Sequence, residues 1–157
     1  FAPSAMSTAK VYGTAAAGIP LTHRNVGQAV ALVTGHHDPD TPDCTLDWDA
    51  LARLPGLVFY MASRHVAKIA SKLSDSGMSP DTPAAVIESA TLPAQRVVVG
   101  DLADIGDRVE GDGGPAVLVV GEVVARANPG RESGGVSKVE PISTPGLASR
   151  IRRGVPA

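Results

Sequence analysis

The sequence predicts an α/β fold built on a mixed sheet, at least partly parallel, with crossover helices. Short apolar runs of strand length alternate along the chain with segments whose apolar residues recur at helical spacing. Residues typical of turns separate these segments. Strands joined through a helix generally lie parallel in one sheet, and ligands of such sheets collect at the carboxyl ends of the strands.

The individual elements follow from local patterns. Residues 57–61, "LVFYM", form a continuous apolar run, as expected for a strand that is covered on both faces. Residues 63–77 place Val66, Ile69, Ala70 and Leu73 at helical spacing, and Gly77 follows where a C-terminal cap belongs. Asp47 is expected to cap a helix over residues 48–54.

The remaining elements are less uniform in pattern. Residues 26–35 fit a strand or a helix equally well. Further strands are expected over residues 84–89, 95–100 and 116–124. A short helix is expected over 102–110, although Gly106 lowers its helical propensity.

Composition limits the class of protein. Apolar residues make up 43% and charged residues 19% of 157 residues, which is typical of one globular domain. The longest apolar stretch, 115–125, is about half the roughly 18 residues that a membrane span needs. The N-terminus has no signal-peptide pattern, and the single cysteine, Cys44, excludes an internal disulfide framework. We therefore expect a cytoplasmic protein without a membrane span; because residue 1 is Phe, the chain was either processed or is part of a longer one.

Charge is unevenly distributed. Residues 1–125 hold 8 Lys and Arg against 14 Asp and Glu, whereas residues 126–157 hold 6 against 2. The latter segment is rich in Gly, Pro and Ser and has no sustained apolar period, so it predicts a flexible tail after a domain of residues 1–125. A basic tail is compatible with a nucleic acid or an acidic partner, but a solvated tail that binds no nucleic acid is the expectation.

Three segments carry candidate site chemistry, while the standard phosphate, dinucleotide and serine-hydrolase motifs are absent. Residues 36–44, "HHDPDTPDC", hold metal-ligating side chains, but adjacent histidines in an extended chain point apart, so we expect no metal site. His23 and Arg24 in "GIPLTHR" (18–24), and Arg96 in "TLPAQRVVVGDL" (91–102), suit either an anion-binding rim or the polar ends of strands.

Five motifs occur together in the order and spacing of one family. They are "GIPLTHR", "ALVTGH" (31–36), "LVFYM", "SATLPAQRVVVGDL" (89–102) and "VVGEVV" (119–124). From about Ser7 to Val124 the chain resembles the C-terminal half of uroporphyrinogen-III C-methyltransferases, S-adenosylmethionine (SAM) enzymes of the tetrapyrrole methylase superfamily. The resemblance implies the second domain of a two-domain α/β fold, with the active site between the domains.

The resemblance also implies site residues. Thr8, Ala9, Met61 and Ala90 match cofactor-contacting positions, with Gly121 as a further one. His23, Arg24 and Arg96 are candidates for holding the carboxylates of the tetrapyrrole substrate, although Arg96 also suits the bracing of a loop. The implied reaction is the double C-methylation of uroporphyrinogen III to precorrin-2, on the route to sirohaem and cobalamin, with no metal and no assigned catalytic residue in this chain.

The chain departs from the family in several places. The family's N-terminal domain, with its "GxGPGD" and "GGDP" segments, has no counterpart here, so the chain alone is expected to be inactive and to expose an apolar face for that domain. Family members dimerise, which implies a homodimer. Ala62 replaces a family glycine and Asp101 a threonine, changes expected to narrow the cleft or alter its charge. The alternatives are a non-catalytic remnant that binds a tetrapyrrole or a partner, and a sister methylase of a later precorrin.

Overall fold

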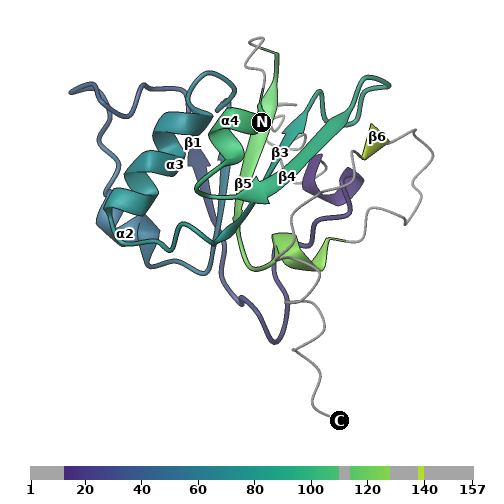
Figure 1. Ribbon diagram of the computed structural model, residues 1–157, viewed down its shortest axis with the longest axis horizontal. Helices are drawn as coiled ribbons and strands as arrows, with labels where there is room; N and C mark the ends of the chain where they lie inside the picture. The colour runs from purple at the N-terminus through teal and green to yellow at the C-terminus, as the bar shows by residue number, and fades with distance from the viewer. Residues whose placement is uncertain (1–12, 110–113, 128–137, 140–157) are drawn as a thin grey trace, which may run out of the picture.

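The structure, a computed structural model, describes residues 13–109, 114–127 and 138–139, which form one mixed sheet with helices against it (Figure 1). Six strands lie in the order β1-β2-β5-β3-β4-β6. The fold class predicted from the sequence is confirmed. The strands are β1 (Ala31–Thr34), β2 (Gly56–Tyr60), β3 (Pro83–Glu88), β4 (Arg96–Asp101), β5 (Ala116–Gly121) and β6 (Lys138–Val139).

Strand direction determines where the ends of the strands lie. β1 pairs parallel with β2, and β5 pairs antiparallel with both β2 and β3. β1, β2 and β3 therefore run in the same direction, although β5 lies between β2 and β3. β4 is antiparallel to β3, and β6 is parallel to β4.

The helices begin and end largely where their capping residues predict. α2 (Trp48–Ala52) begins after Asp47, whose Oδ1 accepts a hydrogen bond from the backbone N–H of Ala50 at 2.9 Å. α3 (Val66–Asp75) ends shortly before Gly77, which has a φ of +96° that favours glycine. α4 is short (Ile105–Arg108), and a 3-10 turn, η1 (Val124–Arg126), follows β5.

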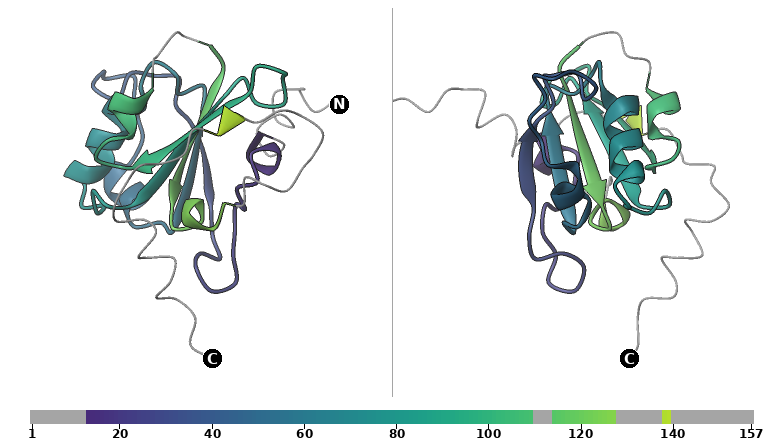
Figure 2. Two further views of the ribbon diagram at one scale, coloured as in Figure 1. Left: turned by 45° about the vertical axis from the view of Figure 1, so that its right-hand side comes forward. Right: turned by 90° about the vertical axis from the view of Figure 1, so that its left-hand side faces the viewer.

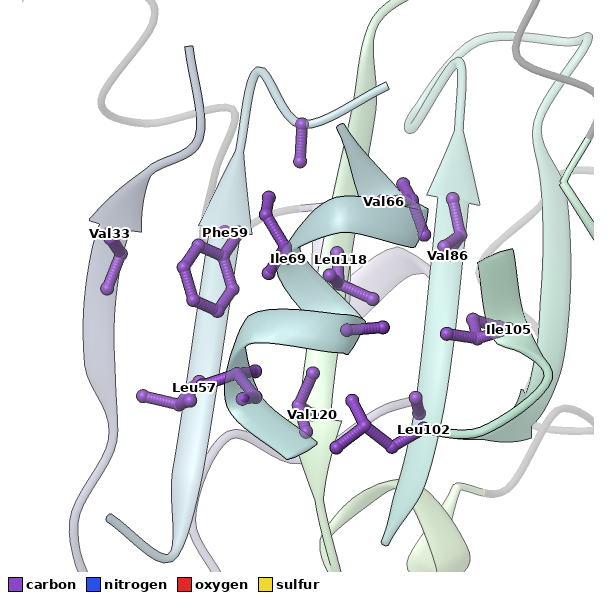
Figure 3. Close-up of a cluster of buried hydrophobic side chains, with 14 of the residues drawn as sticks. Val33, Leu57, Phe59, Val66, Ile69, Val86, Leu102, Ile105, Leu118 and Val120 are labelled. Atoms are coloured by element: carbon purple, nitrogen blue, oxygen red, sulfur yellow. The ribbon is translucent and has the colours of Figure 1, made fainter. Parts of the chain in front are cut away.

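The sheet is covered on both faces, as the continuous apolar strands predicted. One buried cluster lies under the helices and includes Phe59, Ile69 and Leu118, which Figure 3 shows packed between α3 and the strands. The other cluster lies on the opposite face, where residues from the segment 17–30 and from η1 pack on the alternate strand positions. Figure 2 shows α3 and α4 on one side of the sheet and η1 on the other.

Several boundaries differ from the prediction. Within residues 26–35 only 31–34 form a strand, and β5 ends at Gly121 because the chain turns there with a φ of +136°. Lys138 and Val139, inside the segment expected to be a flexible tail, form β6; residues 128–137 and 140–157 lie outside the described residues. No helix in the described ranges is long and apolar enough to cross a membrane.

Candidate functional site

The carboxyl ends of β1, β2 and β3 meet at one edge of the sheet, here called the carboxyl edge. These strands end at Thr34, Tyr60 and Glu88, and the chain continues there into Gly35, Met61 and the loop 89–95. Strand β5 begins at the same edge, since Tyr60 is in register with Val117 and Glu88 with Ala116. This is the edge at which sheets with parallel strands bind their ligands.

Strained backbone is concentrated at the carboxyl edge. Among the described residues, the non-glycine residues with positive φ are Met61 (59°), Ser89 (47°) and Thr91 (69°), and all follow the ends of β2 or β3. Each such conformation costs on the order of 1–3 kcal/mol and persists only where the surroundings enforce it. Strain that gathers at a ligand-binding edge points to a functional site.

Met61 and Ala90 give this edge an apolar lining. Met61 is 41% exposed, although Ala62 beside it is completely buried. Ala90 lies against Gly13, where an added Cβ would be 3.0 Å from the Ala90 Cβ. The small size of both residues allows the segment 13–17 to approach the loop 89–95 closely.

The side chain of Gln95 joins these two segments through hydrogen bonds. The backbone N–H of Thr91 donates to Gln95 Oε1 at 2.8 Å, and Gln95 Nε2 donates to the carbonyl oxygen of Ala16 at 3.4 Å. Sequence reasoning assigned Gln95 no role, because its second partner lies 79 residues away. The one local signal is an amide side chain that follows the turn residues Thr91–Pro93 and directly precedes strand β4.

Arg96 also lies at the carboxyl edge. It is in register with Glu88, and its Nη1 lies 3.7 Å from Glu88 Oε2. The guanidinium is partly exposed, so this ion pair contributes at most about 1 kcal/mol. Arg96 therefore pairs with a carboxylate across β3 and β4, and its exposure leaves donors facing solvent.

The structure separates the other candidate residues from this edge. His23 and Gly27 exchange backbone hydrogen bonds of 2.9 and 3.1 Å in a tight turn, and an added Cβ on Gly27 would lie 3.4 Å from Pro55, just before β2. Arg24 is an exposed residue of that turn. The turn thus lies at the end of the sheet opposite Met61, on the order of 15 Å away because each strand residue adds about 3.3 Å.

Gly121 lies at this opposite end as well. It is in register with Gly56, and an added Cβ would lie 2.5 Å from the carbonyl oxygen of Pro55. Close packing and a positive φ account for this glycine, and the structure does not bring it together with Met61 and Ala90. Thr8 and Ala9 lie outside the described residues.

Of the two substitutions relative to the family pattern, Ala62 is buried and Asp101 lies at the end of the sheet opposite Met61. Ala62 is buried, and an added Cβ on Gly35 would lie 3.0 Å from its Cβ. Asp101 is in register with Pro83 at the opposite end of the sheet, where its backbone N–H donates to Asp104 Oδ1 at 3.0 Å. Neither change alters the charge beside Met61.

The acidic segment 36–44 is attached to α3. Lys68 binds the carboxylates of Asp38 and Asp40, and Lys72 lies 3.0 Å from Asp40. The hydrogen bond from Lys68 lowers the pKa of Asp38 below its ordinary value, and that from Lys72 lowers the pKa of Asp40. In the part of the chain that the structure describes, no three His, Cys, Asp or Glu side chains come together as a metal site would require.

Comparisons with known proteins identify relatives of this chain. Residues 3–106 match the family described as Tetrapyrrole (Corrin/Porphyrin) Methylases. The chain is 50% identical over 118 residues to a siroheme synthase of Neisseria meningitidis serogroup C (strain 053442), covering 74% of this chain and 24% of that protein. It is 42% identical over 120 residues to an S-adenosyl-L-methionine-dependent uroporphyrinogen III methyltransferase of Methanosarcina barkeri (strain Fusaro / DSM 804), covering 74% and 47%.

Solved structures of methyltransferases share the fold of this chain. Uroporphyrin-III C-methyl transferase from Thermus thermophilus, in complex with S-adenyl homocysteine, superposes with a TM-score of 0.59 and 34% identity over 69% of this chain and 48% of that one. The cobalamin biosynthetic enzyme cobalt precorrin-4 methyltransferase superposes with a TM-score of 0.63 at 25% identity. The chain thus spans about a quarter of the siroheme synthase and about half of the shorter methyltransferases.

Proposed function

Because the chain belongs to the tetrapyrrole methylase family, we propose that it is the C-terminal part of a SAM-dependent uroporphyrinogen III methyltransferase. The observation that supports this proposal is the group of residues with positive φ at the carboxyl edge. Met61 and the loop around Ala90, the positions that match cofactor contacts of the family, coincide with the positive-φ residues. Strain held where a ligand is expected supports a binding site there.

The residues of the carboxyl edge fit the cofactor. The partly exposed Met61 and the small Ala90 offer apolar contact, and the turned backbone beside them offers main-chain hydrogen-bonding groups. We propose Thr8, Ala9, Met61 and Ala90 as cofactor contacts in this chain. Gly121 is explained by its packing against Pro55.

The proposed reaction is the methylation of two carbons of uroporphyrinogen III, giving precorrin-2. SAM, when bound, supplies an electrophilic methyl group on a positively charged sulfur. The chain's own contribution is positional: Met61 and Ala90 line the cofactor side, and Arg96 offers its solvent-facing donors to substrate carboxylates. The removal of the proton from the methylated carbon is assigned to no residue of this chain.

Arg24 and His23 are proposed as substrate contacts of a separate kind. They lie at the other end of the sheet, so they act on a part of the substrate far from the methyl donor. A change at Arg24 is thus expected to weaken substrate binding and to leave cofactor affinity unchanged.

We also propose that activity requires a domain of the family's N-terminal type and that the assembled enzyme is a homodimer. The matched part covers only 24% of the siroheme synthase and 47% of the methyltransferase, so these relatives extend well beyond it. The non-catalytic alternative draws on the missing N-terminal domain and on Ala62 and Asp101. The latter two lie in the core and at the end of the sheet opposite Met61. We therefore favour the catalytic function.

The test is calorimetric titration of S-adenosylhomocysteine into this chain, alone and with an N-terminal methylase domain added, followed by an assay of uroporphyrinogen III methylation. Binding that appears with both domains, together with formation of dimethylated product, supports the proposal. Absence of binding in both mixtures rejects a SAM-dependent function. Binding without methylation of uroporphyrinogen III rejects this substrate and favours a later precorrin.

A further inference from the structure

The loop 89–95 is ordered by its own hydrogen bonds. Leu92 N–H donates to the carbonyl of Ser89 at 3.0 Å, and Gln95 N–H donates to that of Leu92 at 2.9 Å. Ser89 N–H donates to the carbonyl of Pro115, at the start of β5, at 2.9 Å. These bonds fix the two ends of the loop, while its strained centre at Thr91 needs a further partner.

The Gln95 side chain supplies that partner. Its Oε1 accepts from the N–H of Thr91, where φ is 69°, and its Nε2 donates to the carbonyl of Ala16 on the other segment. One planar amide thus satisfies both a loop donor and a distant acceptor. The contact between Gly13 and Ala90 joins the same two segments independently.

We propose that Gln95 is a positioning residue for the cofactor: it holds the loop that carries Ala90 against the segment 13–17. The assignment rests on the proposed function, since Ala90 is a proposed cofactor contact. A side chain that fixes a loop of the binding site pre-organises that site, so it lowers the entropy lost when the ligand binds. Its removal is expected to weaken cofactor binding more than it slows the chemical step.

Three variants separate the two hydrogen bonds. Gln95→Leu removes both, whereas Gln95→Glu keeps an oxygen acceptor for Thr91 and removes the donor to Ala16. Gln28→Leu is the matched control, because Gln28 is an exposed glutamine at the opposite end of the sheet whose side chain donates, among the described residues, to the carbonyl oxygen of Arg24 four residues away. Circular dichroism of each variant establishes that it folds.

The first readout needs no cofactor. Amide hydrogen exchange by NMR on this chain reports the protection of Thr91 N–H. Protection is expected to fall in Gln95→Leu by about tenfold or more, and to persist in Gln95→Glu and in Gln28→Leu. Unchanged protection of Thr91 in Gln95→Leu would overturn the inference at its structural step.

The second readout is S-adenosylhomocysteine affinity and the steady-state kinetics of the two-domain protein. Gln95→Leu is expected to raise Kd and the KM for SAM about tenfold with kcat within about twofold, Gln95→Glu to be intermediate, and Gln28→Leu to keep the wild-type Kd for S-adenosylhomocysteine. Wild-type affinity in Gln95→Leu would overturn the inference and leave the proposed function standing. Failure of the wild-type protein itself to bind would overturn both, and the exchange of Thr91 then reports only on the fold.

Discussion

Gly106 of α4 lies directly against Ala67 of α3: an added Cβ on Gly106 would be 2.7 Å from both the Cα and the Cβ of Ala67. A glycine that weakens a four-residue helix is therefore what allows the two helices to touch. Real Cβ atoms do not approach a neighbouring backbone so closely, and α3 cannot yield without disturbing the buried layer beneath it.

Gly106→Ala is expected to destabilise the protein. The added methyl group forces α4 away from α3, and overpacking of this kind lowers the free energy of unfolding by about 1–3 kcal/mol. Urea denaturation measures the change. Gly27→Ala is the control, since its Cβ would make an ordinary 3.4 Å contact with Pro55, and an equal loss in both variants would contradict the packing explanation.

Gly121→Ala separates packing from cofactor binding. A Cβ there would meet the Pro55 carbonyl oxygen at 2.5 Å in a backbone that favours glycine, so we expect stability to fall by about 2 kcal/mol or more. S-adenosylhomocysteine affinity of the folded two-domain protein should remain that of wild type. A selective loss of affinity at unchanged stability would instead restore Gly121 as a cofactor contact.

Met61→Gly tests whether the Met61 side chain contacts the cofactor. Glycine adopts the φ of 59° without steric strain, and the lost side chain is partly exposed, so the free energy of unfolding should stay within about 1 kcal/mol of wild type. S-adenosylhomocysteine binding of the two-domain protein should weaken about tenfold, because the thioether contact is lost. Calorimetry and thermal unfolding are run on the same samples; unaltered affinity would argue against Met61 as a contact.

Arg24→Gln tests whether Arg24, at the end of the sheet opposite Met61, binds the substrate. We expect a higher KM for uroporphyrinogen III, since a charged donor is lost, and an unchanged Kd for S-adenosylhomocysteine, since Met61 lies on the order of 15 Å away. Arg96→Gln is the comparison at the carboxyl edge. If Arg24→Gln altered cofactor affinity alone, the assignment of Arg24 to the substrate would be wrong.

The acidic segment 36–44 makes stability depend on pH. Hydrogen bonds from Lys68 and Lys72 hold the pKa values of Asp38 and Asp40 below the ordinary 3.8. A carboxyl with a lowered folded-state pKa stabilises the protein above its unfolded-state pKa, and this contribution is lost as the pH falls through the folded-state value.

The double variant Asp38→Asn, Asp40→Asn should therefore lose less stability than wild type when the pH is lowered from about 5 to about 2.5. Urea denaturation at several pH values provides the comparison. Asp43→Asn is the control, because Asp43 lies in the same segment and forms no ion pair with any described residue. Parallel pH curves for wild type and the double variant would contradict the ion-pair assignment.

Local sequence predicts the elements of this fold better than their arrangement. The apolar run ending at Tyr60 and the spacing of Ile69 and Leu73 identify β2 and α3, because burial imposes those periods on the chain. The place of β5 between β2 and β3 depends on pairing partners that are far apart in sequence, which no local period records.

The same limit applies to the site. Met61 and Ala90 were expected from their motifs, and the structure places both at the carboxyl edge. The second hydrogen bond of Gln95 and the location of Arg24 and Gly121 at the other end became visible only in three dimensions. Distances across a sheet depend on strand direction, which residue types alone do not specify.

The insertion of β5 between β2 and β3 has a consequence for biosynthesis. Until residues 116–121 have left the ribosome, β2 and β3 lack the neighbour that joins them, and the nascent chain carries two separated sheet fragments with open edges. Folding must then wait for a late strand to enter the middle of the sheet, a long-range step that is typically slow. During translation these open edges are natural targets for chaperones, which protect such chains from aggregation.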